Sequence, residues 1–232
     1  MKAGLVDVST GLLIGERVRI DTPQPAIPKT MTDALSELVG GFDYSGPVGI
    51  GFPAVIWDGA VFTANNIDES WIGTNVRDLF REAISHEVVV LNDADGAAMA
   101  ESAFGAAEGV PGLVLMVTFG TGVGSGMLVD GHLIPNVELG VIELEGHRPA
   151  EVYFSAKARE IEDLSWDEWG ARANRFLLHL REVLAPHLIV VGGGVAKRWD
   201  LFAHCLDPSL PIELAAIKNN AGIVGAAVAT RR

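Results

Sequence analysis

The order of apolar and polar positions along the chain predicts strands that alternate with helices. Strands are expected where β-branched and other apolar residues run together or alternate, at residues 3–8, 12–20, 47–53, 87–91, 113–119 and 188–191. Helices are expected where apolar residues recur three and four positions apart, at residues 35–39, 75–84, 97–104, 166–184 and 221–230. Asp58-Gly59 and Asp130-Gly131 each predict a hairpin turn. This alternation favours an α/β fold.

The predicted elements fall into two similar cycles, which indicates two α/β lobes. The second cycle begins at Asn92, so we expect an N-terminal lobe of residues 1–92 and a C-terminal lobe of residues 93–232. The last helix is a candidate to pack back on the N-terminal lobe. In α/β proteins, ligands bind at the carboxyl ends of the strands, so polar residues at those ends are the first candidates for chemistry.

Asn92 and Asp93 follow the fully apolar strand at 87–91. A carboxylate at this position can accept a proton from a bound hydroxyl group, with Asn92 orienting the ligand. An acidic residue after a strand is also a common helix cap, and Asp95 suits that role better than Asp93. Asp93 is therefore the candidate base.

Two runs of glycine also follow predicted strands. Residues 118–126, TFGTGVGSG, have glycines at alternate positions, which suits either a phosphate-binding turn or a plain β-hairpin. Gly192-Gly193-Gly194 follows the strand at 188–191 and could admit a nucleotide or phosphate. The sequence GGGVAKR lacks the third glycine of the GxGxxG dinucleotide motif, which makes a dinucleotide-dependent oxidoreductase a distant alternative.

Composition narrows the classes of function. The chain has 232 residues, 49% of them hydrophobic, a single cysteine, Cys205, and a formal net charge of −13. A strongly acidic chain is poorly suited to general nucleic-acid binding, which depends on Lys and Arg to neutralise phosphates. A single cysteine cannot form an internal disulfide or a CxxC metal site. No apolar run reaches the roughly 18–20 residues of a membrane span. A cytoplasmic protein is expected, with no membrane or nucleic-acid partner.

The motifs taken together resemble the ROK family of sugar kinases, within the sugar-kinase/actin-like (ribonuclease H-like) two-lobe fold. Inside that family the chain is most similar to the actinobacterial polyphosphate glucokinases. The resemblance covers nearly the whole chain and lies in segments whose order and spacing are specific: residues 64–71 (ANNIDESW), 92–95 (NDAD), 120–125 (GTGVGS), 135–140 (PNVELG), 164–168 (LSWDE), 192–198 (GGGVAKR) and 220–227 (NAGIVGAA).

The resemblance implies a role for each matching residue. Asp93 would take the proton from the 6-hydroxyl of glucose, and four side chains would bind the sugar: Asn66, Asn92, Glu138 and Glu151. The phosphates of ATP or polyphosphate would meet a second set: Gly120, Thr121, Gly122, Gly124, Gly192, Gly193, Gly194 and Lys197. Mg²⁺ would be held mainly through the phosphates of the donor. The family also implies a homodimer.

The chain departs from the family pattern at three places. It begins after the family's DxGGT strand and loop, so we expect an N-terminal lobe lacking its first strand and a Met1 that is internal to a longer sequence. Val141 replaces the histidine of the ExGH motif, and Ala54 replaces a glycine after Pro53. These departures favour the alternative of a degenerate family member that binds sugar or phosphate without catalysis. A ROK repressor is disfavoured because no helix-turn-helix precedes the kinase-like region.

The choice of phosphoryl donor depends on basic residues. A polyphosphate chain needs a track of positive charge, and the same residues can equally be scattered solvated charges. The candidates are Lys157, Arg159, Arg172, Arg175, Lys197, Arg198 and Lys218.

Overall fold

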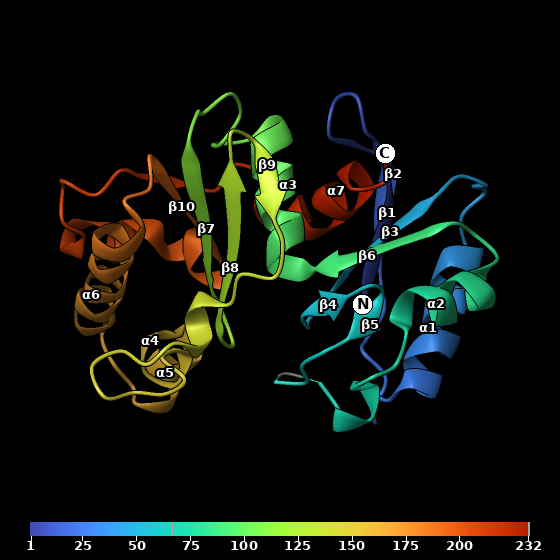
Figure 1. The fold of residues 1–232 in the computed structure, drawn as a ribbon, viewed down its shortest axis with the longest axis horizontal. Coiled ribbons are helices and arrows are strands. Elements are labelled where there is room, and N and C mark those ends of the chain that lie inside the picture. The colour runs from blue at the N-terminus through green and yellow to red at the C-terminus, as the bar shows by residue number, and fades with distance from the viewer. Residues whose placement is uncertain (66, 232) are drawn as a thin grey trace. The chain divides into compact units, whose positions relative to one another are not determined.

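The computed structural model describes residues 1–65 and 67–231, which form two compact units (Figure 1). Unit 1 comprises Met1–Ala100 and Asn220–Arg232, and unit 2 comprises Glu101–Asn219. The sequence placed the division after residue 92, whereas helix α3 (Asp93–Phe104) runs across the division that the contacts give. The first part of α3 belongs to unit 1 because Gly96 packs against Gly225 of the last helix.

Unit 1 contains three short sheets and three main helices. Strands β1 and β2 pair antiparallel, β3 and β6 pair in parallel, and β4 and β5 form a small hairpin. The bounds are β1 (Lys2–Asp7), β2 (Leu12–Arg19), α1 (Pro28–Gly40), β3 (Val48–Phe52), β4 (Ile56–Trp57), β5 (Ala60–Val61), η1 (Glu69–Trp71), α2 (Val76–Ile84), β6 (Val88–Asn92), η5 (Lys218–Asn220) and α7 (Ala221–Val228). Helix α1 begins at Pro28, the last of three prolines that follow one another closely (Pro23, Pro25 and Pro28).

Strand β6 is apolar from Val88 to Leu91 because both of its faces are covered. Val88 and Val90 pack into a core with α1 and α2, whereas Val89 and Leu91 pack against α7. Successive side chains of a strand point to opposite faces, so helices on both faces require an unbroken apolar run. Figure 1 shows α7 on one side of β3 and β6 and the pair α1 and α2 on the other.

Unit 2 is built on one five-stranded sheet in the order β11-β10-β7-β8-β9. Strands β7 and β10 are parallel, and β7, β8 and β9 form an antiparallel meander. The bounds are β7 (Leu113–Phe119), β8 (Val123–Val129), β9 (His132–Ile134), η2 (Leu139–Val141), α4 (Glu151–Phe154), α5 (Ala156–Ile161), α6 (Trp166–Leu184), β10 (Leu188–Gly193), η3 (Gly194–Leu201), η4 (Ala203–Cys205) and β11 (Ile212–Leu214).

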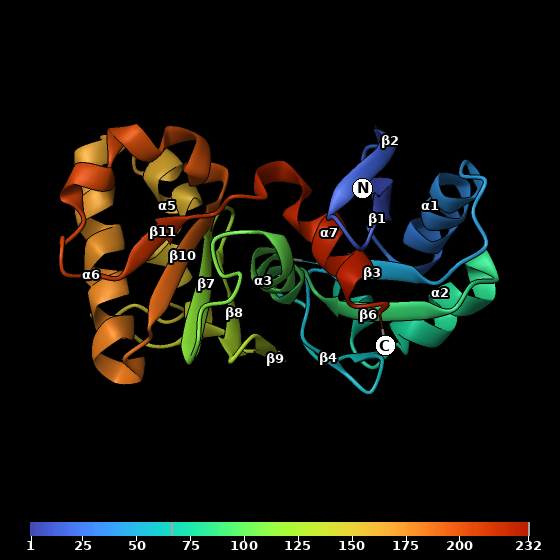
Figure 2. The same cartoon turned by 90° about the horizontal axis from the view of Figure 1, so that it is seen from above.

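The core of unit 2 joins the sheet to α6, which lies alongside β10 and β11 in Figure 2. Phe119 of β7 makes edge-to-face contacts with Trp169 and Phe176 of α6. The helix begins with a capping box, in which Ser165 and Glu168 satisfy each other's backbone N–H groups. These contacts hold the ends of β7 and β10 in place.

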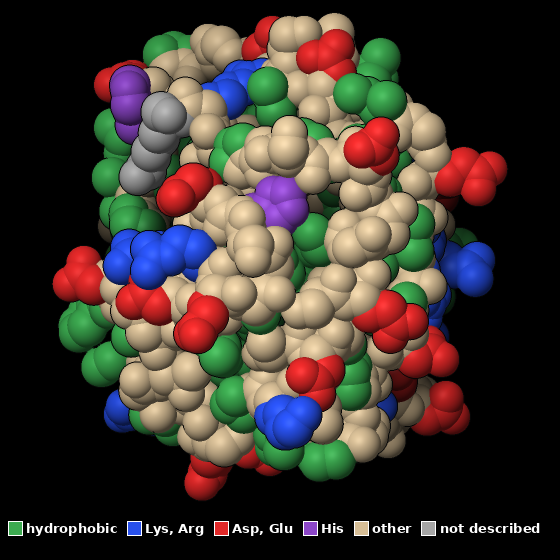
Figure 3. Space-filling model, turned by 90° about the vertical axis from the view of Figure 1, so that its right-hand side faces the viewer, with side chains coloured by type: hydrophobic (Ala, Val, Ile, Leu, Met, Phe, Trp, Pro, Cys, Tyr) green, Lys and Arg blue, Asp and Glu red, His purple; other side chains and the backbone are tan. Residues whose placement is uncertain are grey.

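The surface agrees with the acidic composition. No helix within residues 1–65 and 67–231 is long and apolar enough to cross a membrane. On the face drawn in Figure 3, the Lys and Arg side chains are separate from one another and interspersed with Asp and Glu. That face offers no continuous basic surface of the kind that binds nucleic acid.

Candidate active site

Unit 1 places the candidate base at the carboxyl end of its parallel strands. Phe52 of β3 is in register with Asn92 of β6, and Asp93 is the first residue of α3. A strand that runs directly into a helix brings the first helical side chain to the edge of the sheet, where α/β proteins bind ligands. Helix α3 was expected to begin at residue 97, but it begins four residues earlier because Asn92 caps it.

The side chain of Asn92 is buried and holds this junction together. Its Oδ1 accepts hydrogen bonds from the backbone N–H of Ala94 at 2.8 Å and of Asp95 at 3.3 Å. Its Nδ2 donates to the carbonyl of Ala54 at 3.3 Å. Asn92 is thus the N-cap of α3, and the expectation that Asp95 would suit that role was wrong. A side chain that accepts these bonds fixes the direction in which Asp93 leaves the strand.

The side chain of Asp93 is accessible to solvent. Desolvation by the surrounding protein raises the pKa of Asp93 above its ordinary value, and hydrogen bonds from the backbone N–H of Ala94 and of Asp93 itself oppose that rise. A carboxylate with a raised pKa is a stronger base than an ordinary one. These are the properties that a general base needs.

The substitution at Ala54 is accommodated without strain. Ala54 is buried, is not among the residues with positive φ, and accepts the bond from Asn92 through its carbonyl. The backbone at position 54 therefore does not need the positive φ that favours glycine. Asn66, the remaining sugar-binding candidate of unit 1, lies outside the described residues.

In unit 2, the two glycine segments lie at the same edge of the sheet. Strands β7 and β10 are parallel and in register, with Gly192 opposite Thr118 and Gly193 opposite Phe119. The turn Gly120–Gly122 and the segment beginning at Gly193 are therefore neighbours. A Cβ at Gly193, whose φ is +83°, would lie 2.5 Å from the carbonyl oxygen of Phe119, so only glycine fits.

The run TFGTGVGSG combines both structures that the sequence left open. Residues 120–122 form a tight turn, closed by the N–H of Gly120 on the carbonyl of Gly122 at 3.0 Å. From Val123 onward the chain is strand β8, and Gly124 lies in that strand opposite Thr118. The exposed side chain of Thr121 is at the tip. The phosphate-binding candidate is therefore a hairpin turn.

Two residues of the following helices brace this turn. One carboxylate oxygen of Glu151 accepts the backbone N–H of Val123 at 3.0 Å, and a Cβ at Gly122 would overlap the same carboxylate. The backbone N–H of Lys157 donates to the carbonyl of Gly120 at 3.0 Å. Glu151 therefore has a role inside the protein that the sequence did not predict, because helices α4 and α5 were not expected.

A buried hydroxyl positions the segment that carries Glu138. Ser125 Oγ donates to the carbonyl of Val137 at 2.5 Å and accepts the N–H of Leu139 at 2.8 Å, so it bonds on both sides of Glu138. Gly140 lies so close to the carbonyl of Val123 that a Cβ there would overlap it. Ser125 is buried, so its hydroxyl serves these two internal bonds and is not presented to a ligand.

The residues that follow Glu138 contain no substitute for the missing histidine. Val141 is half-buried at the end of η2. The ring of His147 stacks on that of Tyr153, with centroids 4.0 Å apart and planes inclined by 6°. His147 is thus held by aromatic packing.

The structure divides the candidate basic residues into paired and unpaired ones. Arg172 forms two bonds to Glu162, at 2.9 and 2.6 Å, and Arg175 bonds to Glu145 at 2.9 Å. With Lys157, whose Nζ lies 3.9 Å from the Glu160 carboxylate, three of the seven candidate cations are paired. The guanidinium of Arg159 lies over the ring of Trp166 at 4.1 Å.

Lys197 and Arg198 are exposed on η3, directly after Gly193 and Gly194. Within the described part of the chain, no salt bridge or hydrogen bond of either side chain is recorded. They are the cations of unit 2 best placed to meet an anion at the glycine segment.

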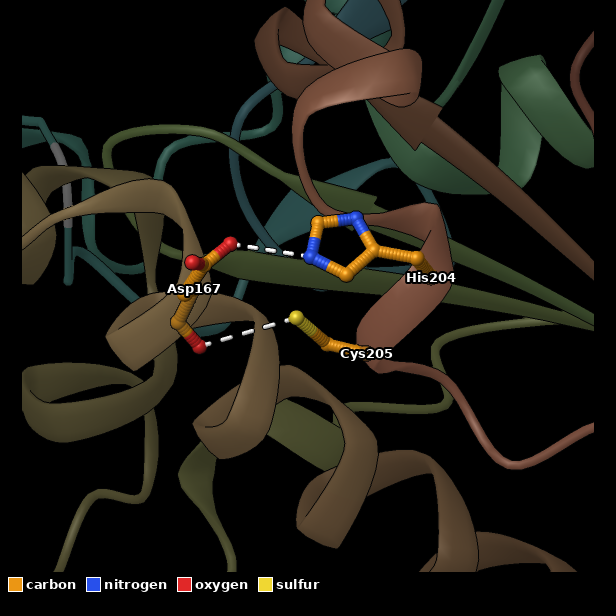
Figure 4. A group of neighbouring side chains, drawn as sticks. All are labelled: Asp167, His204 and Cys205. Atoms are coloured by element: carbon orange, nitrogen blue, oxygen red, sulfur yellow. Dashed lines mark hydrogen bonds and ion pairs between the residues drawn. The ribbon is translucent and has the colours of Figure 1, made fainter.

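One group of side chains in the described residues has the composition of a metal site. Asp167 of α6 and His204 and Cys205 of η4 place their ligand atoms within 4.8 Å of one another (Figure 4). Nε2 of His204 lies 2.9 Å from the Asp167 carboxylate, and Sγ of Cys205 is 3.7 Å from the Asp167 carbonyl. Desolvation, and then the charge of Asp167, raises the pKa of the thiol. A protonated thiol is a poor ligand, and an exposed hydrogen bond between His204 and Asp167 accounts for the cluster.

Comparison with known proteins agrees with this geometry. The sequence matches the ROK family over residues 1–158. It is 42% identical over 231 residues to the polyphosphate glucokinase of Mycobacterium tuberculosis, covering 99% of this chain and 87% of the relative.

Two solved structures are similar over nearly the whole chain. The inorganic polyphosphate/ATP-glucomannokinase of Arthrobacter sp. strain KM has a TM-score of 0.95 and 43% identity, over 99% of this chain and 93% of its own. A ROK family glucokinase from Streptomyces griseus, in complex with glucose and AMPPNP, has a TM-score of 0.81 and 25% identity, over 97% and 93%. The fold is that of the sugar kinases, and the chain belongs to the ROK family.

Proposed function

We propose that this chain is a glucokinase that transfers a phosphoryl group from polyphosphate, ATP or both to the 6-hydroxyl of glucose. The observation that carries the proposal is Asp93, an accessible carboxylate with a raised pKa at the start of a capped helix. The 42% identity to a polyphosphate glucokinase supports the same reaction. The chain is accordingly a transferase, a sugar kinase of the ROK family.

The proposed mechanism gives Asp93 the proton of the attacking hydroxyl. Phosphoryl transfer depends mainly on the position of the two reactants and on stabilising charge, so the protein must hold the hydroxyl in line with the donor. Asn92 keeps Asp93 at the strand end and is a proposed contact of the sugar. Glu138 would accept a sugar hydroxyl, and Glu151 would act chiefly through the turn that it braces.

The donor would lie on the edge of unit 2 formed by the two glycine segments. The turn Gly120–Gly122 carries the exposed side chain of Thr121, and neither Gly193 nor Gly194 has a side chain that would exclude a phosphate. Backbone N–H groups without Cβ atoms around them are suited to phosphate oxygens. Lys197 and Arg198 supply positive charge beside them.

A divalent cation, Mg²⁺ by its preference for oxygen ligands, is part of the proposal. In the described residues, the one group of three possible metal ligands is the Asp167, His204 and Cys205 cluster, whose nitrogen and sulfur donors do not suit Mg²⁺. The glycine edge itself offers backbone groups and one carboxylate, Glu151. The residues therefore fit an ion carried by the donor's phosphates, where it would neutralise their charge.

The proposal is tested by measuring glucose 6-phosphate formation with ATP and with polyphosphate. Turnover with either donor, abolished by Asp93→Asn, is expected. Binding of glucose without turnover by the unaltered chain would instead support the degenerate family member, which the valine at position 141 favours.

The remaining features of the proposal concern setting and assembly. An enzyme that uses ATP or polyphosphate is expected in the cytoplasm, and a homodimer is expected from the family. Size-exclusion chromatography with light scattering measures the assembly directly.

A further inference from the structure

Glu101 is a fully buried carboxylate that has no part in the proposed chemistry. Its side chain is 0% exposed, and its two oxygens accept three backbone N–H groups. Oε2 accepts from Ala106 at 2.8 Å and from Ala216 at 3.0 Å, and Oε1 accepts from Ile217 at 2.8 Å. A buried charge is retained only where such bonds replace its hydration.

The partners of Glu101 come from two segments that are far apart in the sequence. Ala106 follows α3, whereas Ala216 and Ile217 follow β11, more than a hundred residues later. The fit is close, because a Cβ at Gly105 would overlap the Glu101 carboxylate. One side chain therefore fastens the end of α3 to the segment that leaves the sheet of unit 2.

These two segments are the places where the chain passes between the units. It passes from unit 1 to unit 2 after Ala100 and returns after Asn219. Glu101 is the first residue of unit 2, and Ala216 and Ile217 immediately precede the return. The carboxylate thus joins both connections at one point, inside unit 2.

Helix α3 links this point to the candidate base. Asp93 is its first residue and Glu101 lies two turns further along the same helix, so the helix transmits any displacement of one end to the other. We propose that Glu101 is a positioning residue that holds the C-terminal end of α3 and thereby the placement of Asp93, the first residue of that helix, during phosphoryl transfer. This inference rests on the proposed function. Glu101 itself touches no substrate.

The matched variants are Glu101→Gln and Glu108→Gln. Glutamine keeps the size of Glu101 but turns one acceptor into an N–H donor that faces backbone N–H groups. Glu108 is an exposed glutamate in the same segment, so its variant removes the same charge without touching the junction. Gly105→Ala is a second disturbance, since it displaces the carboxylate and leaves Glu101 unchanged.

Two measurements decide the inference. Hydrogen exchange should become at least tenfold faster at residues 106, 216 and 217 in Glu101→Gln and in Gly105→Ala, with β7 and β10 unchanged. The kcat for glucose should fall at least fivefold, and by more than the glucose Kd measured by calorimetry rises. Transfer needs Asp93 in line with the reacting hydroxyl, whereas glucose binding tolerates a small displacement of the helix that carries it. Glu108→Gln should match the unaltered protein in both.

The outcomes are distinguishable from a failure of the proposed function. If the unaltered chain phosphorylates no glucose, the proposed function fails, and the exchange measurement still decides whether Glu101 fastens both connections. Unchanged exchange at 106, 216 and 217 overturns the inference. So does a kcat per folded molecule within twofold of the unaltered protein, because that result leaves Glu101 a purely structural role.

Discussion

At the scale of single residues, the base and its neighbour have different tasks. Asp93 is accessible to solvent and has a raised pKa, which suits proton transfer. Asn92 is buried, and both its amide oxygen and its amide nitrogen bond to the backbone. Sequence alone suggests that adjacent polar residues at a strand end act together on a ligand. The hydrogen bonds show instead that Asn92 fixes the backbone from which Asp93 projects.

Asp93→Asn removes the proposed base without changing its size. We expect kcat to fall by about 10²–10⁴, the usual contribution of a general base, with glucose affinity nearly unchanged. In the unaltered protein, the rate should fall as the pH drops through the pKa of Asp93. Because that pKa is raised, the acid limb should lie above the ordinary value of about 3.9. A limb at or below 3.9, or a variant with undiminished kcat, would contradict the assignment.

The same variant makes an opposite prediction for stability. A carboxyl whose pKa is raised on folding disfavours the folded state at any pH where it is ionised. Asp93→Asn should therefore have a higher Tm than the unaltered protein at pH 7. The difference should vanish as the pH falls below the unfolded-state pKa of about 3.9. Thermal unfolding at several pH values measures it, and a lower Tm at pH 7 would be inconsistent with the desolvation of Asp93.

Ser125 is a second residue whose role appears only in three dimensions. Ser125→Ala leaves the carbonyl of Val137 and the N–H of Leu139 without their partner, at about 1–3 kcal/mol for each buried group. We expect lower stability and a glucose KM raised roughly tenfold, since the segment holding Glu138 is released. Ser102→Ala, which removes only a 3.4 Å bond at the surface, is the control. Loss of stability with an unchanged KM would separate Glu138 from sugar binding.

At the scale of elements, helix α7 depends on glycine for its position. A Cβ at Gly225 would overlap the carbonyl of Gly96 in α3, and a Cβ at Gly49 of β3 would overlap the carbonyl of Ala226. These contacts bring α7 close to both α3 and the sheet. The position of α7 therefore depends on glycines that permit close contact. The spacing of hydrophobic residues in the sequence does not reveal such contacts.

Gly225→Ala should destabilise the protein by about 1–3 kcal/mol, the usual cost of overpacking. Gly222→Ala is the matched control on the same helix, because a Cβ there has nothing within 4 Å. It should be neutral, or stabilising by up to about 1 kcal/mol through helix propensity. Urea unfolding of the two variants measures the difference, and equal stabilities would show that α7 can move away from α3.

The elements that the sequence predicted well share a physical cause. Strands β6, β7 and β10 are covered on both faces, so their apolar runs are unbroken, and α6 has a capping box and a long apolar stripe. Helices α4 and α5 and strand β11 are too short to show a period. Helix α3 was predicted too late because Gly96 and two acidic residues interrupt its pattern, while the Asn92 side chain that caps it is held by a tertiary contact to Ala54.

At the scale of the whole molecule, the candidate site could be predicted only in parts. The sequence located Asp93 and both glycine segments, since each follows a strong strand. It did not show that Glu151 braces the glycine turn or that Glu101 joins the two connections between the units. Those roles depend on residues distant in the sequence, and no local pattern encodes them.

The net charge of −13 makes the choice of donor a question about the whole molecule. A long polyanion is repelled by such a protein, so its binding needs local cations that the surrounding acids do not neutralise. Arg172 and Arg175 are paired with Glu162 and Glu145, whereas Lys197 and Arg198 are exposed beside the glycine segment. We therefore expect polyphosphate use to depend on Lys197 and Arg198.

The double variant Lys197→Ala, Arg198→Ala should raise the KM for polyphosphate at least tenfold and the KM for ATP by much less. Polyphosphate extends beyond the site that holds the transferred group and meets more of the surface than ATP does. Its KM in the unaltered protein should also rise with salt, since screening weakens charge contacts at the surface, and that rise should be smaller in the double variant. Arg175→Ala, which removes an already paired cation, is the control. Equal losses for both donors would assign the two residues to the nucleotide site, and no loss would place the polyphosphate track elsewhere.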